Sequence, residues 1–271
     1  MFNSDKEQVS KILQHLNDKL RKEDGFEIYP INLREYNRFV GKEFHLPNDE
    51  NTFGVVVLST PLWFPRKYQT WIKQIMQEKV LTQEEFQEAY PDPIKQCFEE
   101  CFDEAVRDLD DQRPTIIHDF TFLANRKPKM IMAAAGHASG ATYYYTKNEC
   151  PELLPSDEDR ISAGKKKLIG IAMHPKYGGH FAFRCVILFE KVMLTDLELN
   201  SPVKAIEDKE EIARLILSFN DLWRTGDYRN MGETNGNSYA QKYTEIQMKY
   251  WNSPPAERYK VILEMVQTVL N

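Results

Sequence analysis

The chain has 271 residues, of which 42% are hydrophobic and 28% are charged, and its net charge is −6. This is the composition of a globular protein with one large domain, or one domain with an appendage. The basic residues stand in short groups without interleaved aromatic residues, which argues against a nucleic-acid surface. No apolar run approaches the roughly 20 residues of a membrane span, and the charged N-terminus lacks a secretory signal, so we expect a cytoplasmic protein.

The first sixty residues predict one helix and two strands. Ser4 and Glu7 have the spacing of a capping box, and an apolar stripe of helical period follows them and ends at Asp24. Residues 26–31 (FEIYPI) predict a short strand. Residues 52–60 (TFGVVVLST) are a β-branched run between turn formers, which is typical of a strand buried on both faces.

The next stretch predicts two helices and a strand. Residues 67–80 have a helical pattern. Asp92 and Pro93 are an N-cap and a first-turn proline that open a helix extending to about Asp110. A strand is predicted over residues 115–122 (TIIHDFTF).

Two cysteines, Cys97 and Cys101, lie four residues apart on the apolar face of the second of these helices. A metal or redox pair is one interpretation. We favour buried, unpaired thiols, because no histidine lies near them in the sequence and a cytoplasmic protein keeps its thiols reduced.

The segment 130–145 (MIMAAAGHASGATYYY) is rich in small residues and ends in three tyrosines. Small side chains leave backbone amides accessible, and aromatic rings supply flat walls, so the segment suits a large planar ligand that carries amides. The alternative is a closely packed buried segment with ordinary core tyrosines. Residues 148–167 are polar and predict a loop.

Two further strands, over residues 168–174 and 180–189, are separated by PKYGG, which predicts a hairpin. The turn contains Gly178 and Gly179. Because glycine has no Cβ, this turn allows another backbone or a flat ligand to approach closely.

The second strand of this hairpin carries an arginine. Side chains alternate along a strand, so Arg184 is predicted to share a face with Val186 and Leu188, while Phe183 and Cys185 face the other way. A guanidinium on an apolar face is costly without an anion partner. That partner is either a structural carboxylate or the carboxylate or phosphate of a ligand.

After residue 200 the pattern becomes helical. Helices are predicted over residues 210–223, over 239–251 and after Ser253, with a loop over 232–238. Strands and helices are mixed without a regular strand–helix repeat. We therefore predict an α+β fold with a mainly antiparallel sheet rather than a doubly wound sheet.

Several common sites are absent from the sequence. It has no glycine-rich dinucleotide fingerprint, no phosphate-binding loop, no HExxH and no GxSxG. The six histidines are scattered, so no metal site built directly from protein side chains is expected.

Seven sequence motifs occur in one order along residues 26–259 and together resemble the CblC family of cobalamin-processing proteins over nearly the whole chain. They are FEIYPINLREYN, FHLP, VVVLSTP, GHASGATYYY, HPKYGGHFAFR, FNDLWRTGDYR and YWNSPPAERY. Each motif is weak alone, and their number and order make the resemblance specific.

The resemblance implies a fold and an activity. The fold is a core similar to flavin-dependent nitroreductases, here residues 1–199, with a helical cap over residues 200–271 that contributes glutathione-binding arginines. The activity is removal of the upper cobalt ligand from cobalamin that is bound base-off. Alkyl groups pass to glutathione, and cyanide leaves by reduction with electrons from FMN or FAD. Implied partners are a downstream cobalamin-trafficking protein and a flavoprotein reductase.

The resemblance also implies site residues. Contacts to the corrin fall on Asp119, Met130, Ile131, Met132, Ala133, Tyr144, Tyr145, Thr146, Ala172 and Phe183. His137 is placed near the cobalamin, with no assumption that it ligates cobalt, and the cobalt is carried by the cobalamin itself. Glutathione-binding arginines fall on Arg184, Arg229 and Arg258. Family members can carry Trp where this chain has His180, which leaves the role of His180 open.

Two other functions stay open from the sequence. A flavin reductase of the nitroreductase type would bind flavin and ignore the corrin. A non-catalytic escort would bind cobalamin and hand it on unchanged. The three arginines argue against an escort, because carriage alone does not need a site for a thiol co-substrate.

Overall fold

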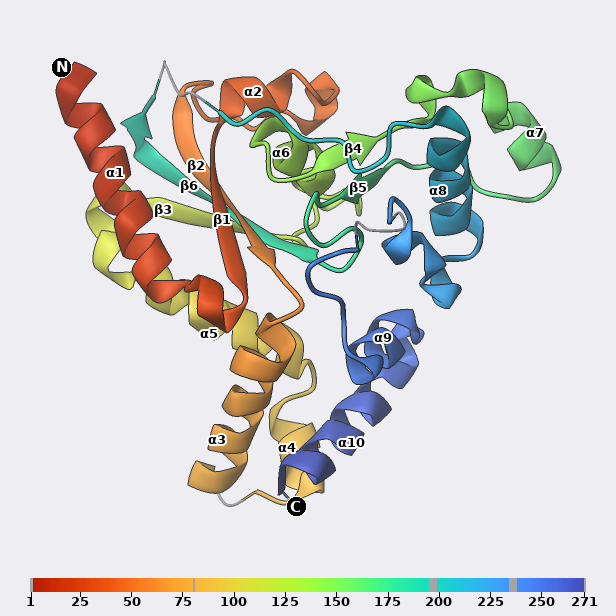
Figure 1. The fold of residues 1–271 in the computed structure, drawn as a ribbon. Coiled ribbons are helices and arrows are strands. Elements are labelled where there is room, and N and C mark those ends of the chain that lie inside the picture. The colour runs from red at the N-terminus through yellow and green to blue at the C-terminus, as the bar shows by residue number, and fades with distance from the viewer. Residues whose placement is uncertain (1, 80, 195–198, 234–237, 271) are drawn as a thin grey trace.

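The structure is a computed structural model that describes residues 2–79, 81–194, 199–233 and 238–270. Its centre is an antiparallel sheet of four strands in the order β1-β2-β6-β3 (Figure 1). These strands are β1 (Phe26–Asn32), β2 (Thr52–Ser59), β6 (Ala182–Met193) and β3 (Pro114–His118). A second sheet pairs two short antiparallel strands, β4 (Tyr143–Tyr145) and β5 (Ile171–Met173). The predicted α+β class with an antiparallel sheet is confirmed.

The strand predicted over residues 52–60 is confirmed as β2, which lies between β1 and β6. All eight residues of β2 are buried. Val55 and Val57 join the hydrophobic cluster on one face of the sheet, and Val56 and Leu58 join the cluster on the other. A β-branched run without polar alternation suits a strand covered on both sides.

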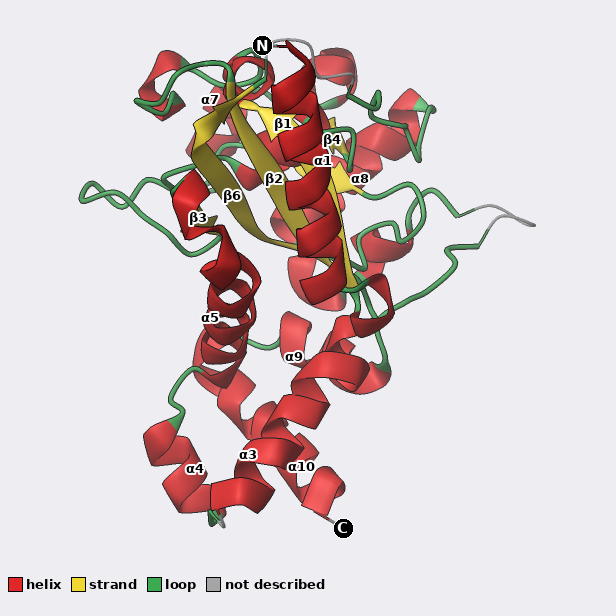
Figure 2. Ribbon diagram, turned by 90° about the vertical axis from the view of Figure 1, so that its left-hand side faces the viewer, coloured by secondary structure: helices red, strands yellow, loops and turns green. Residues whose placement is uncertain are grey.

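One face of the main sheet is covered by α1 (Phe2–Lys19) and α5 (Pro93–Val106), which run side by side along it (Figures 1 and 2). The N-cap predicted at Asp92 is confirmed, since its carboxylate accepts the Lys95 N–H at 3.3 Å. Cys97 and Cys101 are buried in this layer as free thiols, as predicted. α1 begins at Phe2, so Ser4 lies inside its first turn and not at the predicted N-cap.

The opposite face of the sheet is covered by two short helices, α2 (Leu33–Asn37) and α6 (Met132–Ala138). α6 comes from the small-residue segment, and its Ala134 and Ala135 are fully buried. A Cβ added to Gly136 would lie 2.3 Å from the Phe183 ring. The small side chains therefore let α6 pack directly onto β6.

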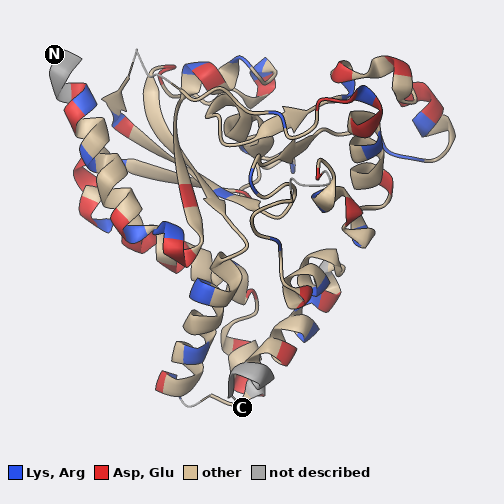
Figure 3. Cartoon of the chain, in the orientation of Figure 1, with Lys and Arg blue, Asp and Glu red and all other residues tan. Residues whose placement is uncertain are grey.

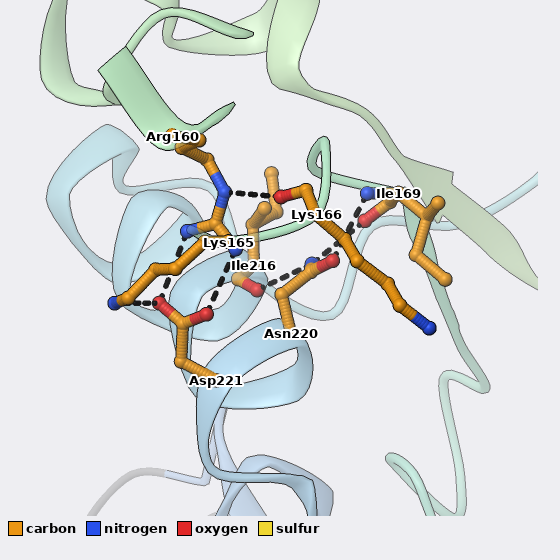
Figure 4. Close-up of polar contacts among 7 residues, drawn as sticks. All are labelled: Arg160, Lys165, Lys166, Ile169, Ile216, Asn220 and Asp221. Carbon is orange, nitrogen blue, oxygen red and sulfur yellow. Dashed lines mark hydrogen bonds and ion pairs between the residues drawn. The ribbon is translucent and has the colours of Figure 1, made fainter. Parts of the chain in front are cut away.

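The remaining helices form two groups. α3 (Gln69–Lys79), α4 (Gln83–Ala89), α9 (Glu245–Asn252) and α10 (Arg258–Leu270) make the lower lobe in Figures 1 and 2. α8 (Lys209–Asp221) packs against β5, with α7 (Asp157–Ser162) beside it (Figure 1). Figure 4 shows how α7 and α8 are joined: Arg160 forms an ion pair with Asp221 at 2.8 Å and donates to the Lys166 carbonyl at 2.7 Å.

The predicted hairpin is wrong. β5 pairs with β4 in the small sheet, and β6 pairs with β2 and β3 in the main sheet. Between β5 and β6 there is only an isolated bridge from His174 to Gly178. The chain changes sheets at this turn, and each strand finds its partners far away in the sequence.

Several predicted boundaries also differ from the structure. The strand predicted over 115–122 ends at His118, and the loop predicted over 148–167 contains α7. The helix predicted over 239–251 begins only at Glu245, where Thr244 provides a capping box. The loop predicted over 232–238 lies partly outside the described residues.

Charged side chains lie mostly on the helices and loops, and the main sheet is largely free of them (Figure 3). Two charged residues of this sheet are nevertheless buried, Glu27 of β1 and Arg184 of β6. Among the described residues, no helix has the length and apolarity that a membrane crossing requires.

Candidate functional site

Arg184 lies at a bulge in β6. Val57 pairs with Cys185, but the next residue, Leu58, pairs with Phe183, so Arg184 is the extra residue. A bulge interrupts the alternation of side chains and redirects the residue that it contains. The guanidinium consequently faces the cluster under α1 and α5, and Phe183 packs toward the opposite cluster. The predicted faces of both residues were therefore wrong.

The guanidinium of Arg184 is held in an aromatic cage and is only 5% exposed. Its carbon lies 4.3 Å from the centroid of the Phe98 ring, 5.1 Å from Trp251 and 5.6 Å from Trp63. Nε donates to the Ser59 hydroxyl at 2.7 Å. Aromatic rings on several sides attract the guanidinium charge and restrict its position.

Asp119 is the carboxylate nearest to Arg184 in the part of the chain that the structure describes. Its Oδ2 lies 3.9 Å from Nη1, which is too far for a hydrogen bond, and its backbone N–H donates to the Arg184 carbonyl at 3.0 Å. Burial raises the pKa of Asp119, although the positive charge of Arg184 opposes this shift. Asp119 thus compensates the Arg184 charge only in part, and a further anion would be favourable.

The three predicted arginines meet around one pair of aromatic rings. Arg184 and Arg258 lie 5.1 Å and 5.7 Å from the Trp251 ring, and Arg229 lies 5.3 Å from the Tyr243 ring. The Trp251 and Tyr243 rings are themselves 6.3 Å apart. We call these three arginines with Tyr243 and Trp251 the arginine site.

Arg229 is incompletely satisfied. Its Nη1 donates to the Gly179 carbonyl at 2.5 Å, but its Nε is buried and finds no acceptor among the described groups. A buried donor without a partner costs free energy unless a ligand satisfies it. Three arginines around one pair of rings, with one unused donor, are an arrangement that suits an anion.

A cavity of about 250 Å³ lies next to the arginine site. Three of the predicted corrin contacts line it, Ala133 of the α6 helix, Ala172 of β5 and Phe183 of β6, and so does Arg229. The structure therefore brings together residues from three separate elements that the resemblance assigned to one ligand. Two larger cavities, of about 820 and 760 Å³, lie against α8 and contain none of the predicted residues.

The other predicted corrin residues around α6 and β4 do not line this cavity. Met130 and Tyr145 are buried, and the Tyr145 hydroxyl donates to the Ile206 carbonyl at 3.2 Å. Half-buried residues at the start of α6 and along β4 complete the set: Ile131, Met132, Tyr144 and Thr146.

His137 is engaged by the protein itself. Its Nδ1 accepts the Tyr144 N–H at 3.1 Å, and its ring lies between those of Phe39 and Tyr143. Burial lowers its pKa, so the neutral ring is favoured. Nδ1 is therefore used within the protein, and the placement of His137 near the cobalamin stays a prediction.

Comparison with known proteins decides the family. A profile of the methylmalonic aciduria and homocystinuria type C family matches residues 25–262, which include the main sheet, the cavity and all three arginines. The chain belongs to this family. A Gallus gallus protein named cyanocobalamin reductase / alkylcobalamin dealkylase is 32% identical over 238 residues, covering 88% of this chain and 90% of its own length.

Two further relatives of the type C family span nearly the same region. The Homo sapiens protein of the same name is 31% identical over 254 residues, covering 94% of this chain and 82% of its own length. The crystal structure of a Caenorhabditis elegans B12-trafficking protein, CblC, matches with a TM-score of 0.84 at 28% identity. The match covers 95% of this chain and 96% of the Caenorhabditis elegans chain.

Sequence reasoning missed three residues in this member of the type C family: His180, Tyr243 and Trp251. Tyr243 stands in a segment that was interpreted only as helix, and Trp251 stands in the motif YWNSPPAERY without an assigned role. Their signal was the clustering of aromatic residues around residue 250, which is typical of a surface that holds guanidinium groups. His180 was recognised as a departure from the type C family, but its contacts could not be predicted.

His180 is buried as the neutral ring, since burial lowers its pKa to about 4. The unfolded chain binds a proton near pH 6.5 and the native state does not, so stability is lost as the pH falls from about 6.5 toward 4. We expect a loss of about 3 kcal/mol over this range. Urea unfolding at several pH values should show a shallower pH dependence in His180→Asn. Equal pH dependence in both proteins would contradict this assignment, because His118 and His137 titrate equally in each.

Proposed function

We propose that this chain processes cobalamin by removing its upper axial ligand. It would dealkylate alkylcobalamins with glutathione and eliminate cyanide from cyanocobalamin by reduction. The observation that carries the proposal is the arginine site, which lies next to a cavity lined by Ala133, Ala172 and Phe183. The names of the similar proteins and the membership of the type C family support it.

The arginine site suits glutathione, which carries two carboxylates and one thiol. Arg184 and Arg229 each have guanidinium donors that the described residues do not satisfy fully. Arginine binds carboxylates bidentately, and neighbouring positive charge lowers the pKa of a thiol toward the thiolate. The protein would contribute mainly the position of the thiol and the exclusion of water.

Dealkylation would then be a nucleophilic substitution. The glutathione thiol loses its proton to solvent, and its sulfur attacks the cobalt-bound carbon in line. The new S–C bond forms as the Co–C bond breaks, and cobalt keeps the bonding electron pair and becomes cob(I)alamin. Alkyl-glutathione is the second product.

Cobalamin would bind with its nucleotide base detached from cobalt. Loss of the axial base removes a donor that stabilises cobalt(III), so cobalt accepts an electron more easily and cyanide can leave. Reduced FMN or FAD would supply the electrons, bound to this chain or delivered by a flavoprotein reductase. His137 Nδ1 accepts the Tyr144 N–H, so this nitrogen is not available to cobalt.

The direct experiment is a titration with methylcobalamin, with and without glutathione, followed by absorbance and by analysis of methylated glutathione. We expect a base-off spectrum on binding, and cob(I)alamin with S-methylglutathione once the thiol is added. In a parallel titration with cyanocobalamin, a spectrum that stays base-on would contradict the proposed reduction. Tight flavin binding without corrin absorbance would favour a flavin reductase, and cobalamin binding without methyl transfer would favour an escort.

Filling the cavity should affect cobalamin and spare glutathione. Ala172→Phe places a ring in a cavity of about 250 Å³, so we expect cobalamin binding to weaken about tenfold or more. Glutathione binding, measured by calorimetry, should change little. Ala163→Phe is the matched control, because Ala163 lines the separate cavity beside α8. Equal cobalamin affinities of the two variants would argue against this cavity as the corrin site.

The domain organisation follows from the same proposal. Residues 1–199 would form a nitroreductase-like core that binds cobalamin, and residues 200–271 a cap. Shared hydrophobic clusters support close docking of this cap, since Ile212 packs with Ile171 and Val261 packs with Ile72. We also propose that the protein acts in the cytoplasm and hands cobalamin to a downstream trafficking protein.

A further inference from the structure

The turn between β5 and β6, residues 174–180, connects the main sheet to the arginine site. The turn is closed by two hydrogen bonds of 2.8 Å between the backbones of His174 and Gly178. One side of it contacts β1, and the other contacts the segment that carries Arg229 and Tyr243. A group that holds this turn against the segment of Arg229 therefore also helps to fix the position of Arg229.

The contact with β1 is a buried cluster around the Glu27 carboxylate. Tyr29 and Tyr177 donate to it at 2.6 and 2.8 Å, and His174 Nε2 lies 3.2 Å away. Burial alone would raise the pKa of Glu27, but these hydrogen bonds outweigh it and lower the pKa to about 2. The carboxylate stays ionised and anchors the turn rigidly to the sheet.

The contact with the cap begins at Gly179. Its N–H donates to the Arg229 carbonyl at 3.0 Å, and Arg229 Nη1 returns a bond to the Gly179 carbonyl at 2.5 Å. A Cβ at Gly179 would lie 2.7 Å from the Arg229 Cα. The close approach that the two glycines predicted is thus made by the Arg229 backbone.

His180 adds the side-chain contacts of this interface. Its Nδ1 accepts the Tyr243 N–H at 3.2 Å, so Nε2 carries the proton and donates to the Asn230 Oδ1 at 3.0 Å. The imidazole is 2% exposed, and its ring meets the Tyr243 ring edge to face at 5.4 Å. Both ring nitrogens therefore form hydrogen bonds. Asn230 follows Arg229 in the sequence, and the Tyr243 ring lies 5.3 Å from the Arg229 guanidinium.

We propose that His180 is a positioning residue of the arginine site, holding Arg229 and Tyr243 where they bind the carboxylates of a thiol substrate. This inference rests on the proposed glutathione-dependent function. An imidazole is suited to the role because one small ring offers an acceptor and a donor in fixed directions. Among the described residues, the Arg229 guanidinium donates only to the Gly179 carbonyl and otherwise contacts the Tyr228 and Tyr243 rings. Loss of His180 would release Tyr243 and Asn230, and with them this side of the Arg229 environment.

The test is the steady-state kinetics of methylcobalamin dealkylation with glutathione as the varied substrate. His180→Leu removes both hydrogen bonds, and we expect KM for glutathione to rise about tenfold or more, with a much smaller change in kcat. His180→Asn keeps an acceptor near the position of Nδ1 and should recover part of the affinity. Asn230→Ala should raise KM in the wild-type protein and have little further effect in His180→Leu.

Arg160→Met is the control for general loosening of the cap. It removes the ion pair between α7 and α8 (Figure 4), so it should lower thermal stability without changing KM for glutathione. The inference is overturned if His180→Leu folds and keeps the wild-type KM, or if Arg160→Met raises KM equally. If the wild-type protein transfers no methyl group to glutathione, the proposed function fails, and that outcome is distinct from a failure of the His180 inference.

Discussion

Replacement of Arg184 by Met is expected to lower kcat/KM for glutathione in methylcobalamin dealkylation by roughly thirtyfold to several thousandfold. Arg184 is buried, and its guanidinium lies among the rings of Phe98, Trp251 and Trp63. Loss of a buried, oriented charge leaves the substrate carboxylate without its partner, which costs about 2–5 kcal/mol. Met retains the length and the apolar contact with the rings, so the fold should be preserved.

The controls for Arg184 separate charge from geometry. Arg184→Lys keeps the charge without the planar pair of donors and should lie between wild type and Arg184→Met. Arg214→Met removes an exposed arginine of α8 outside the arginine site and should leave the kinetics unchanged. Cobalamin binding, measured by absorbance, should be retained in all three variants. Unchanged dealkylation kinetics in Arg184→Met would remove Arg184 from the glutathione site.

Gly178→Ala is expected to destabilise the protein by roughly 3–4 kcal/mol, from backbone strain together with a steric clash. Gly178 has φ of +56°, and an added Cβ would lie 2.2 Å from the Tyr239 ring and 2.6 Å from the Arg229 carbonyl oxygen. The turn would have to move away from the cap. Glutathione binding should weaken as well, because Arg229 moves with it.

Gly164→Ala is the matched control for Gly178→Ala. Gly164 has φ of +71°, and an added Cβ would meet no atom within 4 Å. It should therefore show the backbone strain alone, about 1 kcal/mol, and no effect on glutathione. Denaturant unfolding of both variants gives the comparison. Equal losses of stability would mean that the contact between this turn and the cap contributes nothing.

The elements that the sequence predicted well are those with strong local signals. β2 is a β-branched run between turn formers, and α5 opens with an aspartate cap and a proline, so each is specified by neighbouring residues. The buried thiols of Cys97 and Cys101 follow from the apolar face of the same helix. These features depend on contacts within a few residues, and no knowledge of the whole fold was needed to predict them.

The hairpin prediction failed because it depended on which strands pair. The PKYGG turn is compatible with a hairpin, yet β5 pairs with β4, and β6 forms a twelve-residue strand between β2 and β3. The pairing of β6 with both neighbours buries its apolar residues on two faces, which a local hairpin with β5 would not do. The residues of the PKYGG turn therefore predicted that the chain turns there, but not which strands pair on either side of it.

The sequence by itself determined the α+β class, the buried strand, the resemblance to the type C family and the identity of the arginines. Only the tertiary structure decided where the arginines point. Arg184 is redirected by a one-residue bulge that arises from the register between β2 and β6. Arg229 lies near it because its backbone packs against Gly179, and Arg258 lies near it because Arg184 and Arg258 both contact the Trp251 ring. Register and docking depend on contacts between residues far apart in the chain, which no local pattern encodes.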